Sequence, residues 1–312
     1  MRNKRICVAG IGGIGGLLSA MLGQVCRENL SVYTRGAKAE KLRENGLVLH
    51  SEFYGEKRAP ARVCTRAEEV GEQDLVIICV KNYSLEQVAE ELRPCIRKGT
   101  ILLPVLNGVD SGDRLRRLFP EAVVCDAVIY TISAANPDGS VTQTGPYTHM
   151  FVGSREKDEL HQRCARETAE LFLETGFDCR FTENIEGEIW QKFVLNCAFN
   201  TMTARHRKNI GDIREKEEMR REIRALLEEA YRAGIAEGVQ LPEDLVEIKY
   251  NYVMHTQPGN STSSMARDVE AHRPIELEAF TGTVLRISRE HGLSAPVTRE
   301  YHEALSALTE KD

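Results

Sequence analysis

A glycine-rich segment near the start of the chain has the spacing of a dinucleotide-binding turn. Gly10, Gly12 and Gly15 stand at G-x-G-x-x-G spacing, after an apolar run at 6–9 and before another at 17–22. In a strand–turn–helix context the first glycine makes the tight turn, the second lets the backbone approach a pyrophosphate, and the third lets helix and strand pack closely. The free N–H groups and positive end of the helix would hold the pyrophosphate. Against the alternative of a merely structural loop, we predict a cofactor site made of Gly10, Gly12, Gly13, Ile14 and Gly15.

The residues after the next predicted strand, 29–33, bear on which dinucleotide would bind. Folds that prefer NAD carry an Asp or Glu here for the ribose 2′-hydroxyl, whereas an arginine accommodates the 2′-phosphate of NADP. This strand is followed by Arg35, with Lys38 and Lys41 shortly after it, and the expected carboxylate is missing. The guanidinium of Arg35 is a planar, permanent charge suited to a phosphate. We therefore expect NADPH rather than NADH; the alternative is that Arg35 is a solvated loop residue.

Three polar residues in the second half of the chain share one face of a predicted helix. Lys192, Asn196 and Asn200 are four residues apart, and nearly every other position from 193 to 199 is apolar. Because a surface helix normally carries a wide charged face, this helix should be buried on most sides. Its polar stripe then needs partners, since an unpaired buried polar group costs about 1–3 kcal/mol. The stripe either lines a wet substrate cleft, which we predict, or is hydrogen-bonded internally at a domain junction.

A lysine in such a cleft could take part in carbonyl reduction. Hydride transfer to a ketone puts negative charge on the carbonyl oxygen, and a positioned ammonium can stabilise that oxygen and then give it a proton. Partial burial would lower the pKa of Lys192 toward the working pH.

Two other polar positions follow this helix. The run 261–264 (Ser-Thr-Ser-Ser) precedes a short predicted helix, which it could cap, or its hydroxyl and N–H groups could hold a carboxylate. Glu276 lies two residues after Pro274, in the predicted first turn of another helix. It could complement the helix dipole or belong to a site.

Composition and charge restrict the classes of protein to which the chain can belong. Its 312 residues, 42% hydrophobic and 28% charged, suit a globular protein with two domains. A net charge of −6 without a basic run argues against a nucleic-acid partner, and no apolar run predicts a signal or membrane segment. The nine scattered cysteines, which include no C-x-x-C pair, are interpreted as reduced thiols of a cytoplasmic protein. The eight histidines lack metal-ligand spacing, so we predict no metal.

The first part of the chain alternates between predicted strands and helices, which is typical of an α/β doubly wound parallel sheet. Continuous apolar runs at 74–80 and 100–106 predict strands buried on both faces, with a helix at 85–92 between them. Other strands, of which the last form a more antiparallel portion, are predicted at 47–49, 61–63, 123–131, 141–144 and 148–153.

From about residue 184 the signals are almost wholly helical. Helices are predicted at 186–205, 216–237, 243–255, 265–271, 275–291 and 298–308. We therefore predict a Rossmann-like NADP-binding domain at 1–183 and an all-helical C-terminal substrate domain at 184–312. Lys81 and Asn107 each follow a buried strand, at the sheet edge where ligands of α/β folds bind, so we expect the helical domain to close over them.

Taken together, these segments resemble the ketopantoate reductase (2-dehydropantoate 2-reductase) family from end to end. The resemblance is carried by 10–15 (GIGGIG), 80–81 (VK), 107–108 (NG), 190–196 (WQKFVLN), 263–265 (SSM) and 274–276 (PIE). It implies NADPH-dependent reduction of 2-dehydropantoate to pantoate, on the route to pantothenate and coenzyme A.

The resemblance also implies roles for single residues. Lys192 would be the general acid that protonates the oxygen after hydride reaches C2, and Glu276 would support substrate orientation and catalysis. Some family members place an Asn three residues before the matching serine, where this chain has Ser261. Substrate contacts are implied for Asn107, Asn196, Asn200 and Ser264, and cofactor contacts for Arg35, Lys81, Asn107 and the glycine turn.

Other functions stay open at this point. The chain could reduce another branched 2-oxo acid, catalyse an opine-like condensation, or bind NADPH as a sensor without turnover. The presence of both Lys192 and Glu276 favours an enzyme over a sensor. The expected partner is a small 2-oxo acid, and a homodimer is possible because the apolar helical faces could pack within one chain or between two.

Overall fold

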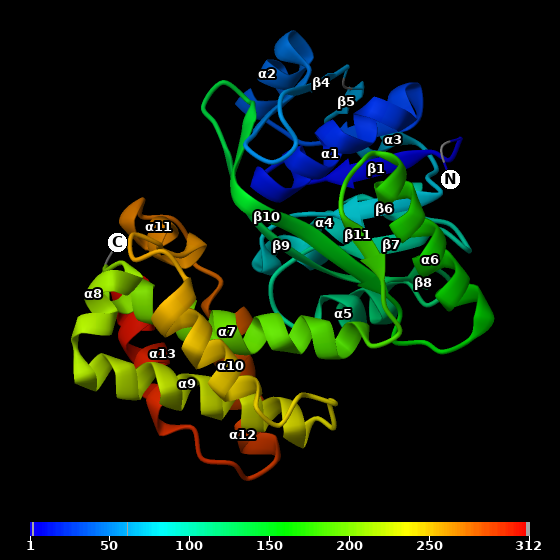
Figure 1. Ribbon diagram of the computed structural model, residues 1–312. Coiled ribbons are helices and arrows are strands. Elements are labelled where there is room, and N and C mark those ends of the chain that lie inside the picture. Colours follow the sequence, from blue (N-terminus) through cyan, green and yellow to red (C-terminus); the bar gives the residue numbers. More distant parts are fainter. Residues whose placement is uncertain (2, 61, 310–312) are drawn as a thin grey trace. The chain divides into compact units, whose positions relative to one another are not determined.

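A computed structural model describes residues 1, 3–60 and 62–309 (Figure 1). The chain divides into two compact units, Met1–Ile185 and Glu186–Asp312, and each is described by itself. The predicted fold class is confirmed, since the first unit holds a parallel sheet with helices and the second is helical. The predicted strand at 61–63 begins at a residue that lies outside the described ones.

The first unit is built on a parallel sheet with strand order β5-β2-β1-β6-β7-β8. Side chains alternate between two cores, with Ile6 and Val8 in one and Cys7 and Ala9 in the other. Because both faces are covered, the central strands are continuous apolar runs. The strands are β1 (Ile6–Ala9), β2 (Leu30–Tyr33), β5 (Arg62–Cys64), β6 (Leu75–Ile78), β7 (Ile101–Pro104) and β8 (Val123–Val124).

A second sheet in the same unit has the order β11-β10-β3-β4, and β9 pairs antiparallel with β10. The predicted strand at 123–131 is wrong as one strand: its first part is β8, and after Cys125 the chain leaves the parallel sheet and enters β9. The predicted strands at 141–144 and 148–153 are one strand, β10, whose register shifts between Thr144 and His149. Gly145, with φ of +82°, and Pro146 lie at that shift. Because both residues usually end a strand, the sequence predicted two strands in place of one. The strands are β3 (Leu47–Ser51), β4 (Lys57–Ala59), β9 (Asp126–Ala135), β10 (Val141–Gly153) and β11 (Cys179–Phe181).

Helices cover both sheets of the first unit. The helix that follows the glycine turn, α1, contacts strands of both sheets, so it is apolar on nearly all sides. The prediction found this helix and α4, but not α2, α3, α5 or α6. The helices are α1 (Gly13–Cys26), α2 (Ala37–Asn45), α3 (Ala67–Val70), α4 (Leu85–Glu91), α5 (Ser111–Leu118) and α6 (Glu159–Glu174), with short 3-10 turns at Arg27–Asn29, Asn82–Ser84 and Arg93–Cys95.

In the second unit, several helices pack on α9 (Glu217–Ala236), and aromatic side chains of α7 (Ile185–His206) form part of its core. Trp190 of α7 lies edge-on to Phe193, which stacks on Phe280 with ring centroids 6.3 Å apart. Gly234 of α9 lies against Trp190, because a Cβ there would stand 2.9 Å from the indole. These contacts explain why most of α7 is apolar.

Two predicted helices of this unit have different bounds in the structure. The predicted helix 243–255 ends in a π-helical turn, and the one at 275–291 starts only at Leu277 and opens with another π-helical turn. The short helix α8 was not predicted. The remaining elements are α8 (Ile210–Glu215), α10 (Leu245–Asn251), η4 (Tyr252–Thr256), α11 (Ser264–Glu270), η5 (Glu278–Gly282), α12 (Thr283–Glu290) and α13 (Pro296–Thr309).

Candidate functional site

The glycine turn between β1 and α1 is crowded at Gly10 and Gly15 and open at Gly12. Gly10 has a φ of +87°, and a Cβ there would lie 2.8 Å from the carbonyl oxygen of Cys79. A Cβ on Gly15 would overlap the carbonyl oxygen of Gly10. A Cβ on Gly12, in contrast, would meet nothing within 4 Å. The turn therefore needs glycine for its own shape at Gly10 and Gly15, while at Gly12 it leaves room for a ligand.

The start of α1 suits an anion. Gly12 is the N-cap residue and offers no side chain to the helix, and the first turn contains no acidic residue. The N–H groups of the first turn are therefore available to an acceptor that the helix itself does not provide. Gly13 lies against strand β9, where a Cβ would come 2.5 Å from the carbonyl oxygen of Ser133. A pyrophosphate fits these features, since it needs N–H donors, positive potential and a close backbone.

The other predicted residues of this unit gather at the carboxyl edge of the parallel sheet. The ends of β1, β2, β6 and β7 lie level, because Ala9 pairs with Tyr33 and with Ile78, and Ile78 pairs with Pro104. Arg35, Lys81 and Asn107 follow β2, β6 and β7 within three residues. The structure thus brings Gly10, Arg35, Lys81 and Asn107 to one edge.

Arg35 is half-exposed and takes part in a polar cluster. Its guanidinium donates to the hydroxyl of Tyr33 at 2.5 Å and forms an ion pair with Glu91 of α4. These two contacts orient the guanidinium at the loop after β2. The side chain is 52% exposed, so it can still meet a ligand at this edge.

A second cation lies closer to the glycine turn. The ammonium of Lys38, on α2, donates to the carbonyl oxygen of Ile11 at 2.6 Å. Lys38 is half-buried, and burial lowers its pKa. No site role was predicted for Lys38. Its position three residues after Arg35, on the first turn of α2, was the available signal.

The second unit contains the lysine and its polar stripe. Lys192 and Asn196 are half-buried and Asn200 is buried, all on one face of α7. Burial lowers the pKa of Lys192 from its ordinary value to about 8, and the nearby carboxylate of Glu276 opposes this shift. Glu276 is itself buried and lies just before the helix that starts at Leu277, so the predicted position in a first helical turn is wrong.

One acidic residue of the same face was missed. Glu188 lies one turn before Lys192 on α7 and is half-buried, and burial raises its pKa while Lys249 of α10 opposes that rise. The four-residue spacing continues from Lys192 back to Glu188, which was the signal in the sequence. The polar stripe of α7 therefore runs from Glu188 to Asn200.

The serine run 261–264 contains a helix cap. The hydroxyl of Ser263 accepts from the N–H of Ala266 at 3.0 Å, so Ser263 is the N-cap of α11. Thr203 of α7 donates to the same hydroxyl at 2.8 Å, which fixes the serine run beside the end of the polar stripe. Ser264 is half-buried at the first helical position.

Several other features could have carried chemistry. No group of three His, Cys, Asp or Glu side chains with metal-binding geometry occurs within residues 1, 3–60 and 62–309. In that same part of the chain, no helix has the length and apolar character needed to cross a membrane. All nine cysteines lie in the described part of the chain as free thiols, buried except for the half-buried Cys79.

Two family models match the chain. The model described as ketopantoate reductase PanE/ApbA matches residues 6–157, and the model described as ketopantoate reductase PanE/ApbA C terminal matches residues 184–309. Together they cover both units.

Similar proteins extend over almost the whole chain. YkpB of Bacillus subtilis, an uncharacterized oxidoreductase, is 29% identical over 94% of this chain and 95% of its own. A 2-dehydropantoate 2-reductase of Mesorhizobium japonicum is 28% identical over 91% of each chain. A crystal structure of a PanE/ApbA family ketopantoate reductase from Ralstonia eutropha aligns with a TM-score of 0.89 at 25% identity over 98% of each chain. A D-mandelate dehydrogenase solved with NADH and anilino(oxo)acetate shares the fold, with a TM-score of 0.88 at 20% identity over 98% of each chain.

Proposed function

Because the chain belongs to the ketopantoate reductase family, we propose that it reduces 2-dehydropantoate to pantoate with NADPH. The observation that carries the proposal is Lys192, a half-buried ammonium whose pKa burial lowers to about 8. A group with such a pKa can hold a proton near neutral pH and release it to a developing alkoxide. The activity would place the enzyme in pantothenate and coenzyme A biosynthesis.

The cofactor half of the site is proposed from the first unit. The open position at Gly12 and the uncapped start of α1 fit a dinucleotide pyrophosphate, together with Gly10, Gly13, Ile14 and Gly15. Lys81 and Asn107 are proposed to contact the cofactor farther along the sheet edge. A bound NADPH would supply the hydride for C2 of the oxo acid.

The residues of the second unit would handle the substrate oxygen. The ammonium of Lys192 donates a hydrogen bond to the C2 carbonyl oxygen and transfers its proton as the C–H bond forms, so the products are an alcohol and neutral lysine. The carboxylate of Glu276 favours the ammonium form of Lys192 before the reaction. Glu276 and the amides of Asn107, Asn196 and Asn200 are proposed to orient the substrate, and Ser264 to receive its carboxylate.

Preference for NADPH is proposed from Arg35. Its half-exposed guanidinium follows β2, where a 2′-phosphate would lie in this fold. Lys38, which reaches the glycine turn, adds positive charge beside it. NADH is the alternative, and the D-mandelate dehydrogenase with the same fold was solved with NADH.

Reduction of a different 2-oxo acid is the second candidate function. Ser261 replaces the asparagine that some family members have three residues before the matching serine, and its shorter side chain lacks an amide. This change favours a substrate with different polar groups beyond C2. The relatives at 28–29% identity leave room for such a change.

A panel of 2-oxo acids, with NADPH consumption as the readout, tests both candidates. Under the first proposal 2-dehydropantoate gives the highest kcat/KM, and under the second another branched or aromatic 2-oxo acid does. Lys192→Ala should abolish most turnover while NADPH still binds, whereas Lys216→Ala, an exposed lysine of the same unit, should change neither. Turnover of Lys192→Ala near the wild-type rate would contradict the assigned acid.

A homodimer and a cytoplasmic location stay predictions. Sedimentation equilibrium over a range of protein concentrations measures the first, and fractionation of the source cells measures the second.

A further inference from the structure

The two loops that carry Lys81 and Asn107 are joined by the residue next to Lys81. Asn82 is buried, and its side-chain N–H donates to the main-chain carbonyl oxygen of Asn107 at 2.9 Å. This bond connects the loop after β6 to the loop after β7. A change in it would alter the spacing between Lys81 and Asn107.

Arg114 of α5 fixes the other end of the Asn82 side chain. One guanidinium nitrogen of Arg114 donates to the side-chain oxygen of Asn82 at 2.5 Å, and another donates to its main-chain oxygen at 3.0 Å. Arg114 is mostly buried and also pairs with Glu86 of α4. The carboxamide of Asn82 therefore lies between a cation and a carbonyl, and each of its two ends has a partner of the right polarity.

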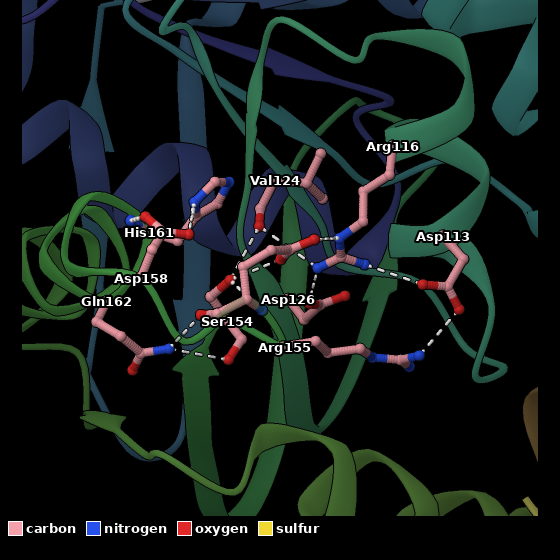
Figure 2. Close-up of polar contacts among 10 residues, drawn as sticks. Asp113, Arg116, Val124, Asp126, Ser154, Arg155, Asp158, His161 and Gln162 are labelled. Carbon is pink, nitrogen blue, oxygen red and sulfur yellow. Dashed lines mark hydrogen bonds and ion pairs between the residues drawn. The ribbon is translucent and has the colours of Figure 1, made fainter.

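Helix α5, which carries Arg114, is also held by contacts with strand β9. Arg116 of α5 pairs with Asp126 at the start of β9 at 2.5 Å and also contacts Asp113, as Figure 2 shows for the side chains. Asp126 is buried, so this ion pair has little competition from water. A Cβ on Gly112 would overlap the Asp126 carboxylate, which shows how closely α5 approaches β9.

The loop after β7 has a second attachment. Arg155, after β10, donates to the carbonyl oxygen of Val109 at 2.6 Å and to Asp113 at 2.9 Å. Figure 2 shows the Arg155 and Arg116 side chains converging on Asp113. Val109 lies two residues after Asn107, so the loop is fixed on both sides of its glycine.

We propose that Asn82 is a positioning residue that sets the spacing of Lys81 and Asn107 at the sheet edge, with Arg114 as its support. The inference rests on the proposed function, because it gives Lys81 and Asn107 their contacts with the cofactor. Asn82 acts through its bond to the Asn107 loop and not by contact with the reacting atoms. Its loss therefore weakens cofactor binding and leaves the proton donor on α7 unchanged.

The test is Asn82→Asp, which keeps the size of the side chain and the partner of Arg114. The new carboxylate oxygen cannot donate to the carbonyl oxygen of Asn107 and repels it. Because the altered loop would no longer hold Lys81 and Asn107 at the spacing that the cofactor needs, we expect the Kd of NADPH, measured by fluorescence titration, to rise about tenfold or more. At saturating NADPH and substrate, the pH profile of kcat should keep its wild-type midpoint.

The matched control is Asn45→Asp. Asn45 also donates from its side chain to a main-chain carbonyl, that of Asp138 at 3.2 Å, but it is exposed and lies outside the sheet edge. Its substitution should leave the Kd within about twofold of wild type. Arg114→Lys is the second variant. Lysine keeps the charge for Glu86 but cannot reach both oxygens of Asn82, so the Kd of NADPH should rise as it does in Asn82→Asp.

The outcomes separate this inference from the proposed function. An unchanged Kd in Asn82→Asp and in Arg114→Lys, with a lowered melting temperature, would make the cluster purely structural and overturn the inference. If the Kd rises as expected but no 2-oxo acid is reduced by the wild type, the inference stands and the proposed function fails.

Discussion

The guanidinium of Arg35 and the carboxylate of Glu91 form an ion pair between the loop after β2 and helix α4. The ion pair holds the guanidinium of Arg35, which is the proposed ligand of the 2′-phosphate, against the protein. A phosphate that binds Arg35 has to share the guanidinium with the carboxylate of Glu91 or displace that carboxylate. The ion pair therefore gives the cofactor preference a feature that can be altered from either side.

Arg35→Ala should weaken NADPH binding alone. We expect the Kd of NADPH to rise about tenfold, because a charge-assisted contact is lost, and the Kd of NADH to stay within about twofold. Glu91→Gln should act in the opposite direction and lower the Kd of NADPH by about two- to fivefold, because an ion pair at the surface contributes only modestly. Equal weakening of both cofactors by Arg35→Ala would remove Arg35 from the cofactor choice.

Gly12→Ala and Gly15→Ala separate binding from folding in the glycine turn. The methyl group added by Gly12→Ala would point into open space, so stability should change by less than about 1 kcal/mol while NADPH binding weakens strongly. At Gly15 the Cβ would overlap the Gly10 carbonyl, and overpacking should cost about 1–3 kcal/mol or more of folding free energy. Urea unfolding and fluorescence titration measure the two effects. Full NADPH affinity in Gly12→Ala would mean that the cofactor does not approach this residue.

The rate of reduction should fall as the pH rises through about 8. The proposed proton donor is the ammonium of Lys192, whose pKa burial lowers to about 8, so the active form would be lost above that pH. The carboxylate of Glu276 partly opposes this lowering. Glu276→Gln should therefore shift the fall to lower pH, in addition to any loss of rate. The pH profile of kcat checks both statements, and a midpoint that moves upward in Glu276→Gln would contradict the electrostatic role.

Gly234→Ala should destabilise the helical unit. The added methyl would stand 2.9 Å from the indole of Trp190 and 2.9 Å from Leu241, closer than carbon atoms pack. Overpacking of this kind costs about 1–3 kcal/mol. A drop in the urea midpoint with unchanged NADPH affinity is the expected result. A midpoint equal to that of the wild type would mean that the indole moves aside freely.

The fold could be predicted from the sequence where local pattern decides structure. Strands β6 and β7 are short apolar runs, and the stripe of Lys192, Asn196 and Asn200 follows the helical repeat directly. Strand β10 was divided in two because Gly145 and Pro146 usually end a strand, whereas here they occupy a register shift that long-range pairing with β9 tolerates.

The supporting residues of the site could not be predicted in this way. Asn82 bonds to Asn107 and Arg114, which lie 25 and 32 residues away, and no periodic pattern relates such positions. Helix α5, which carries Arg114, was not predicted either, because charged residues hide its short apolar face. The sequence thus shows groups that could bind ligand more readily than groups that hold them in position.

The enclosed thiols of this protein have a practical consequence. Burial raises the pKa of Cys7, Cys125 and Cys197 well above the ordinary range, so these sulfurs stay protonated and unreactive in the native state. An alkylating reagent would reach them only when the surrounding core opens. The labelling rate of these thiols therefore measures how often the core of each unit opens. Cys7 and Cys125 report on the first unit and Cys197 on the second.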